Sequence, residues 1–480
     1  MALPGLSAVS SPTLRARVSR HRSLLTNAAS LFATTGVTAL SGVAFWWVAA
    51  HRLPLASVGY ASAAVSAMTL IATVGMLGFG TMLIAEAGRV PGRSGGLITA
   101  ALLAAGAVSG AGALLVVGTA GLAGGFIPSA RSVGGAGWLV VGAALISVGF
   151  VLDQALVGLL AGGVQLARNT VFSLAKLGAV ALVAGVWGPR YGVGVLAAWV
   201  LGAAVSLLVL APILWRRRLG VVGRPDWVAL YRLRRVTASH SVLNLATQAT
   251  RLALPVLVTA LLSATTGAVF YVAWMVAQLV YLLPGHLATV LFAIGAGETE
   301  VLADKLRVTL TVSVALGAVV TTAVAVFAHP LLAVFGPSYA ADATWPLRLL
   351  LIGFLPMVVK VHYVAVVRVQ RRLTLGAAVT AGGTLAELGG AIAGGLAGGL
   401  DGLCLGLLVV LVVEALVCAP TVALAAIHRA RRPVIPGPSP APGSTGRRRD
   451  GGRHATTTPT SPPASRPPIV TGSCRTTPPP

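Results

Sequence analysis

Long apolar runs separated by short polar gaps make up most of the chain. A bilayer core about 30 Å thick needs about 20 helical residues to cross it, and about twelve runs have a suitable length. The pattern therefore predicts an all-α, polytopic membrane protein. The expected spans are 26–50, 57–86, 96–122, 135–160, 169–187, 192–214, 239–262, 266–296, 307–328, 345–367, 374–398 and 401–427.

Composition supports this prediction. Of the 480 residues, 56% are hydrophobic and only 10% are charged, whereas a soluble chain has roughly 25% charged residues. This excludes a soluble enzyme. The net charge of +24 would suit a nucleic-acid binder, but the Arg residues lie in the gaps between apolar runs, which is typical of membrane topology. The expected partners are therefore membrane lipids, with no nucleic acid.

The number of cationic residues alternates between high and low in successive gaps between the apolar runs. Cytoplasmic loops collect Lys and Arg, and one set of gaps holds most of them, whereas the other set holds little more than Arg52, Arg131 and Arg190. This pattern predicts an even number of spans in the plasma or inner membrane, with both termini cytoplasmic. The cation-rich gaps include Arg89 and Arg93, Arg168, Arg216 to Arg218, Lys305 and Arg307, Arg371 and Arg372, and Arg431 and Arg432.

A basic connection divides the spans into six and six, and the first span of each half begins alike, at Ser23 to Asn27 and at Ser241 to Asn244. Such similarity is typical of transporters built from two related bundles. We therefore expect two six-helix lobes. The predicted segments are a basic cytoplasmic N-terminus (1–25), an N-lobe (26–214), a cytoplasmic linker (215–238), a C-lobe (239–427) and a disordered Pro/Ser/Thr/Arg-rich cytoplasmic tail (428–480).

Two cations beside prolines give the sharpest polar signal. Arg251 lies near the middle of its span, and Pro255 four residues later releases the Arg251 carbonyl. Lys360 and His362 follow Pro356 in another span, where that proline predicts a second kink. Charges in the membrane are costly, so we expect a cationic cavity for a phosphate or another anionic headgroup. For Lys360, snorkelling to the interface is an equal alternative.

Other ionisable residues have two interpretations. Asp153 and Lys176 fall at comparable depths and are either a structural pair, which we favour, or a proton- or cation-coupling site. Glu387 and Glu414 could also serve coupling, although neither has an obvious partner in the sequence.

Tyr271, Trp274, Gln278 and Tyr281 follow one another at spacings of three, four and three residues, which places them on one helical stripe. Aromatic faces with a nearby amide suit sugar rings. Ordinary helix packing, with the first two rings in an aromatic belt, is the slightly favoured alternative.

Motifs for catalysis are missing. The chain has no G-x-x-x-x-G-K-[ST] phosphate loop, no H-E-x-x-H, no G-x-S-x-G and no Cys and His at metal-ligand spacing. We therefore expect no enzymatic activity, no catalytic residue, no cofactor and no metal site.

Three segments resemble the polysaccharide and O-antigen flippase branch of the MATE-like multidrug, oligosaccharidyl-lipid and polysaccharide exporter superfamily. They are HRLPLASVGYASAAVSAMTLIATVGMLGFGTMLIAEAGR (51–89), FGPSYAADATWPLRLLLIGFLP (335–356) and GGLAGGLDGLCLG (394–406). The resemblance implies two lobes around a central cavity that opens alternately to either face. It also implies cationic cavity residues, for which Arg251 is the best candidate and Lys360 the second.

The expected function is therefore the outward translocation of lipid-linked oligosaccharide or polysaccharide precursors, with polysaccharide-synthesis enzymes as candidate partners. A cation-coupled efflux pump for small organic cations is the rival within transport. The first span has no acidic residue, which disfavours that rival because many drug-exporting relatives bind a coupling cation through a carboxylate of the N-lobe. A non-transporting scaffold of a polysaccharide-synthesis complex is the rival from another class.

Overall fold

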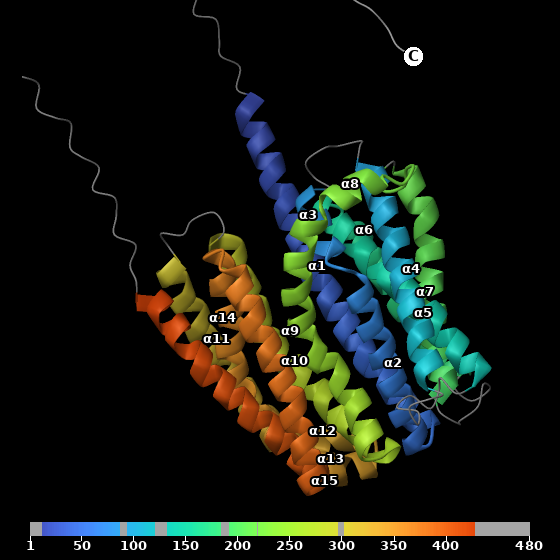
Figure 1. Ribbon diagram of the computed structural model, residues 1–480, viewed down its shortest axis with the longest axis vertical. Coiled ribbons are helices and arrows are strands. Elements are labelled where there is room, and N and C mark those ends of the chain that lie inside the picture. Colours follow the sequence, from blue (N-terminus) through green and yellow to red (C-terminus); the bar gives the residue numbers. More distant parts are fainter. Residues whose placement is uncertain are drawn as a thin grey trace, which may run out of the picture. The chain divides into compact units, whose positions relative to one another are not determined.

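The computed structural model describes residues 12–86, 94–120, 132–183, 192–217, 219–295 and 302–427. All regular elements in these ranges are helices (Figure 1). The first half of the chain forms α1 (Pro12–Arg52), α2 (Leu55–Gly75), α3 (Phe79–Glu86), α4 (Ser94–Ala120), α5 (Val133–Gly158), α6 (Gly162–Val183) and α7 (Val193–Arg216).

The short helix α8 (Trp227–Arg232) lies in the predicted linker, and the second half of the chain begins after it. It consists of α9 (Arg234–Leu261), α10 (Ala264–Gly295), α11 (Leu302–Val326), α12 (Ala328–Ala333), α13 (Pro337–Ile352), α14 (Phe354–Val369) and α15 (Leu373–Ile427).

The described helices confirm a polytopic, all-α membrane protein. Nine of them are long and apolar enough to cross a membrane, or up to ten if the bent pair α13 and α14 is one span. The 55-residue α15 contains non-helical backbone at Gly398 and Gly399, so it comprises two arms, as the sequence predicts. Counting the bent pair as one span and the two arms of α15 separately gives eleven candidate spans in the described residues, and α6, which corresponds to the predicted span 169–187, brings the helices that match predicted spans to twelve.

Three of the expected spans differ from the helices in their boundaries or continuity. The predicted span 57–86 is divided into α2 and α3, because Leu77 and Gly78 have positive φ angles of 46° and 70°. The predicted span 345–367 is longer: its helices begin at Pro337, and α13 meets α14 at a bend of 45°. Helix α1 begins inside the segment predicted as a basic N-terminus. Residues 428–480 lie outside the described residues.

Helix packing occurs mainly within each half of the chain. In the first half α6 packs against α1 and α7, and α4 packs against α5. In the second half α15 packs against α9 and α14, and α10 packs against α13 and α14. The main link between the halves is α2, which lies beside α9 and α10 (Figure 1).

The contact between α2 and α10 is close because it uses glycine. A Cβ at Gly59 would overlap the Ala264 backbone carbonyl, so only glycine lets these backbones approach so closely, as in other membrane helix pairs. A shared apolar core supports the junction. It includes Phe45 and Trp46 of α1 and Phe270 of α10, all essentially inaccessible to solvent.

Candidate functional site

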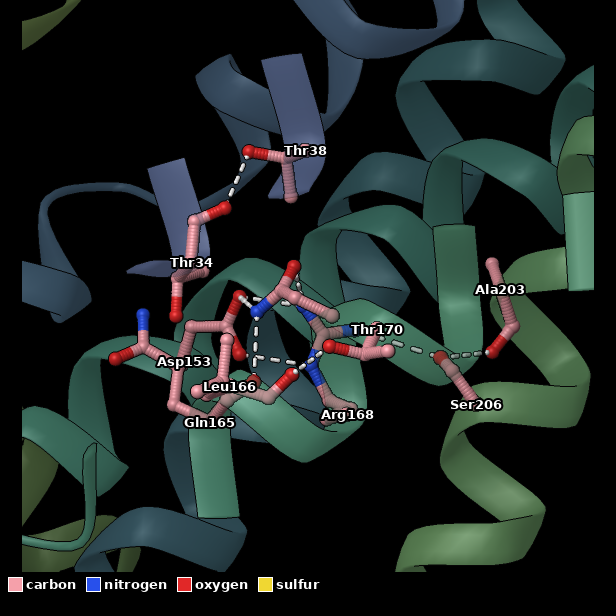
Figure 2. Close-up of polar contacts among 10 residues, drawn as sticks. Thr34, Thr38, Asp153, Gln165, Leu166, Arg168, Thr170, Ala203 and Ser206 are labelled. Carbon is pink, nitrogen blue, oxygen red and sulfur yellow. Dashed lines mark hydrogen bonds and ion pairs between the residues drawn. The ribbon is translucent and has the colours of Figure 1, made fainter. Parts of the chain in front are cut away.

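A buried ion pair joins α5 and α6. The Arg168 guanidinium donates through Nε to Asp153 Oδ1 at 2.7 Å and through a terminal nitrogen to Asp153 Oδ2. Asn169 Nδ2 donates to the same Oδ2 at 3.1 Å. Figure 2 shows Asp153 and Arg168 pointing toward each other and Ser206 beside Arg168. Since both charges are paired bidentately and hydrogen-bonded, the cluster is well suited to hold α5 against α6.

The expected pair of Asp153 and Lys176 is wrong. Asp153 is bound by Arg168, and Lys176 lies two turns further along α6, among aromatic rings. Its Nζ is 4.2 Å from the Trp199 ring centroid, 4.8 Å from that of Phe172 and 5.6 Å from that of Phe45. The side chain is buried, and cation–π attraction to these rings replaces a carboxylate as its stabilisation.

Arg251 lies on a polar, exposed face of α9. Thr247, Gln248 and Arg251 are all exposed, and Asn244 one turn earlier is half-buried. The Arg251 Nε donates to Gln248 Oε1 at 3.1 Å. Acyl chains do not tolerate such a face, so we infer that it meets water rather than lipid.

Arg251 also lies beside a contact between the two halves of the chain. Its charge interacts with Tyr271 of α10. The Tyr271 ring centroid is 4.5 Å from that of Trp46 in α1. The guanidinium therefore sits where α1, α9 and α10 come together. Trp46 could not be recognised beforehand as a member of this group, because an apolar run carries no information about which residue of another span it meets.

Backbone chemistry positions Arg251 as well. Pro255 has no N–H, so the Arg251 carbonyl lacks its usual helical partner. The Trp274 indole N–H donates to this carbonyl at 3.1 Å. Helix α10 thus supplies the hydrogen bond that proline removes from α9.

The four residues of the predicted stripe on α10 differ in how deeply they are buried. Trp274 and Tyr281 are buried, and the Tyr281 hydroxyl donates to the Leu350 carbonyl at the end of α13. Both polar groups are therefore used to join helices, as the packing interpretation expects. Tyr271 and Gln278 are half-buried, so these two remain the better candidates to contact a ligand.

Lys360 does not lie in an unneutralised cationic site. Its Nζ is 2.6 Å from Glu387 Oε1 and 2.9 Å from Glu414 Oε2. The two carboxylates come from the two arms of α15. Together they more than neutralise the charge of the Lys360 ammonium. This contact corrects both the snorkelling and the headgroup-binding expectations for Lys360.

His362 is likewise placed differently from expectation. Its side chain is inaccessible to solvent, and its Nδ1 is 2.8 Å from the Val358 carbonyl in its own helix. We therefore assign it no direct contact with a ligand.

These features define a class: a multi-pass, all-α membrane protein with two sets of helices and a polar, cationic position at their junction. Solved structures with this fold are MATE transporters. An inward-facing multidrug resistance MATE family transporter of the MOP superfamily matches with a TM-score of 0.59 and 18% identity, over 81% of this chain and 95% of that one.

The outward-facing form of a multidrug resistance MATE family transporter of the MOP superfamily matches with a TM-score of 0.60 and 18% identity, over 84% of this chain and 95% of that one. A MOP superfamily transporter from Pyrococcus furiosus, described as having a binding pocket of reverse polarity that suggests a different function, matches with a TM-score of 0.59 and 15% identity over 84% and 95% of the two chains. No family model matches the chain, and no curated protein matches it. At these identities the likeness shows the fold.

Proposed function

We propose that this protein is a membrane transporter that moves the anionic headgroup of a lipid-linked oligosaccharide or polysaccharide precursor to the outer face. The observation that carries the proposal is the exposed Arg251 on the polar face of α9, beside Tyr271 and the contact between the halves. A pyrophosphate offers oxygens that a guanidinium binds in bidentate fashion. Tyr271 and Gln278 would lie against the saccharide.

Charge supports this choice over an efflux pump for organic cations. A cavity lined by Arg251 repels a cationic drug and attracts a phosphate group. The multidrug resistance proteins with this fold keep efflux as the second candidate. Both functions use alternating access, and neither requires catalysis.

A reconstitution experiment tests the proposal. Proteoliposomes holding the full-length protein are given a fluorescent undecaprenyl-pyrophosphate saccharide, and the outward appearance of the label is followed. Arg251→Ala should lower the rate about tenfold or more, since a hydrogen bond to a charged group contributes about 1.5–3 kcal/mol. Lys305→Ala is the control, because Lys305 is an exposed cation outside this site.

Three results would contradict the proposal. Equal rates for wild type and Arg251→Ala would show that Arg251 does not bind the headgroup. Transport of a cationic dye in place of the saccharide favours efflux. No transport of either compound favours a scaffold that assembles polysaccharide-synthesis enzymes.

A further inference from the structure

Three ionisable side chains meet inside the second half of the fold: Lys360 of α14, and Glu387 and Glu414 of the two arms of α15. We call them the C-half cluster. The side chain of Glu387 is 2% exposed and those of Lys360 and Glu414 are each 12% exposed. Because these groups lie in membrane-spanning helices, they are expected to have a function rather than to arise by chance.

The surrounding helices are shaped to hold the cluster. A Cβ at Gly383 would overlap the Glu414 carboxylate, so glycine makes room for that group against the first arm of α15. The Thr250 hydroxyl of α9 donates to Glu387 Oε2. One turn away, the Thr384 hydroxyl donates to the Ala246 carbonyl at 2.7 Å, which fastens the same arm to α9.

The charges of the cluster do not balance. Two carboxylates and one ammonium leave one negative charge when all three groups are ionised, and such a charge is costly in a low-dielectric interior. The titratable neighbours that act on the cluster are Cys418 of α15 and Tyr281 of α10, and both are neutral in their ordinary forms at pH 7.

No other charged group of the packed helices forms an ion pair with the C-half cluster in the described part of the chain. On α9, α11, α13, α14 and α15, the other ionisable residues whose side chains the structure describes are Arg251 on α9, Asp304, Lys305 and Arg307 on α11, Tyr339, Asp342 and Arg348 on α13, His362, Tyr363 and Arg368 on α14, and Asp401 and Cys404 on α15.

The two carboxylates differ in their partners. Glu387 accepts hydrogen bonds from both Lys360 and Thr250. Glu414 has the Lys360 ammonium 2.9 Å from its Oε2, and it faces the Glu387 carboxylate, whose charge opposes its own. Glu414 is therefore the member on which the excess charge is least stabilised.

We propose that Glu414 is a proton-binding site: it takes one proton from water as an O–H bond on its carboxylate, which makes the C-half cluster neutral, and releases that proton to water again. Lys360 is the cation of the cluster and donates a hydrogen bond to Glu387. The site stands on the contacts above, and its use to drive transport rests on the proposed function.

The structure also supplies a route from this site to the exposed cation. Thr250, which contacts Glu387, is followed directly by Arg251 in α9. When Glu414 loses its proton, Lys360 is attracted to two carboxylates instead of one. Its hold on Glu387 weakens, and through Thr250 this change reaches the turn of α9 that carries Arg251.

Infrared difference spectroscopy tests the proton site without any transport substrate. The full-length protein in lipid nanodiscs is titrated from acidic to alkaline pH, and the C=O band of a protonated, buried carboxyl group is followed. Wild type should show the band at low pH and lose it as the pH rises. Glu414→Gln should lack it, and Asp342→Asn, which removes an exposed carboxyl, should keep it.

Lys360→Met provides a second test with the opposite sign. Without the ammonium both carboxylates lose their counter-ion, so the band should grow and persist to higher pH than in wild type. The proposal is overturned if wild type shows no such band, if Glu414→Gln retains it, or if sodium at constant pH removes it, since a metal cation would then occupy the site. A protein that shows the band but moves no lipid-linked saccharide refutes the proposed substrate and leaves the proton site standing.

Discussion

The indole N–H of Trp274 donates to the backbone carbonyl of Arg251 at 3.1 Å, and this is the carbonyl that Pro255 leaves without a helical partner. A side chain of α10 thus supplies the hydrogen bond that the proline of α9 removes. The relationship fixes α10 beside the residue on which the proposed function depends.

The first prediction uses this hydrogen bond. Trp274→Phe leaves the Arg251 carbonyl unsatisfied and should lower the free energy of unfolding by about 1–3 kcal/mol. In a Pro255→Ala background the backbone N–H restored at that position can satisfy the same carbonyl, so the loss should become smaller. Unfolding of the four proteins in detergent micelles measures this double-mutant cycle, and equal losses in the two backgrounds would contradict the assignment.

The second prediction concerns the buried cations of α6. Arg168→Met leaves Asp153 as an unpaired buried charge and should cost about 3–5 kcal/mol of stability. Lys176→Met should cost less, since it removes cation–π contacts of about 2 kcal/mol and leaves no carboxylate without a partner. Thermal unfolding compares the two variants. If Lys176→Met is the more harmful one, an anionic group must neutralise Lys176.

The sequence predicted the helices better than their contacts. Hydropathy is a local property, so it located the spans and the division of α15 near Gly398. The sequence also located the bend between α13 and α14, because Pro356 has no N–H to donate to the carbonyl of Ile352, the residue at which α13 ends. However, it placed Arg168 in a cytoplasmic loop, because a charged residue near the end of a span is typical of a loop. Only the structure shows that Arg168 lies in α6 and pairs with Asp153.

Partners distant along the chain could not be predicted either. Lys360 and Glu387 are 27 residues apart, and Thr250 and Glu387 are 137 residues apart. No pattern within one helix specifies such contacts. Arg251 was recognisable because a deep cation beside a proline is unusual in itself, whereas the neutralised state of Lys360 depends on side chains that only the fold brings to it.

The third prediction concerns the junction of the halves. Gly59→Ala places a Cβ against the Ala264 backbone carbonyl and should push α2 away from α10. Transport should fall strongly, and spin labels on the two helices should report a longer distance. Gly42→Ala in α1 is the matched control because a Cβ there meets nothing within 4 Å. Similar behaviour of the two variants would argue against a role for this contact.

The fourth prediction separates the proton site from its link to α9. Thr250→Val removes the hydroxyl that donates to Glu387, whereas Thr250→Ser keeps it. We expect the valine variant to lose most of the pH dependence of saccharide transport, and the serine variant to retain it. Identical pH profiles for valine, serine and wild type would show that Thr250 carries no coupling.

The most direct test of the account compares two substrates with one saccharide, one attached through pyrophosphate and one through a neutral linker. Wild type should move the pyrophosphate compound at least about tenfold faster, as expected for a charge-assisted contact of about 1.5–3 kcal/mol. In Arg251→Gln the two rates should become nearly equal, with the neutral compound unaffected. An unchanged preference in Arg251→Gln would contradict the claim that this guanidinium recognises the anionic headgroup.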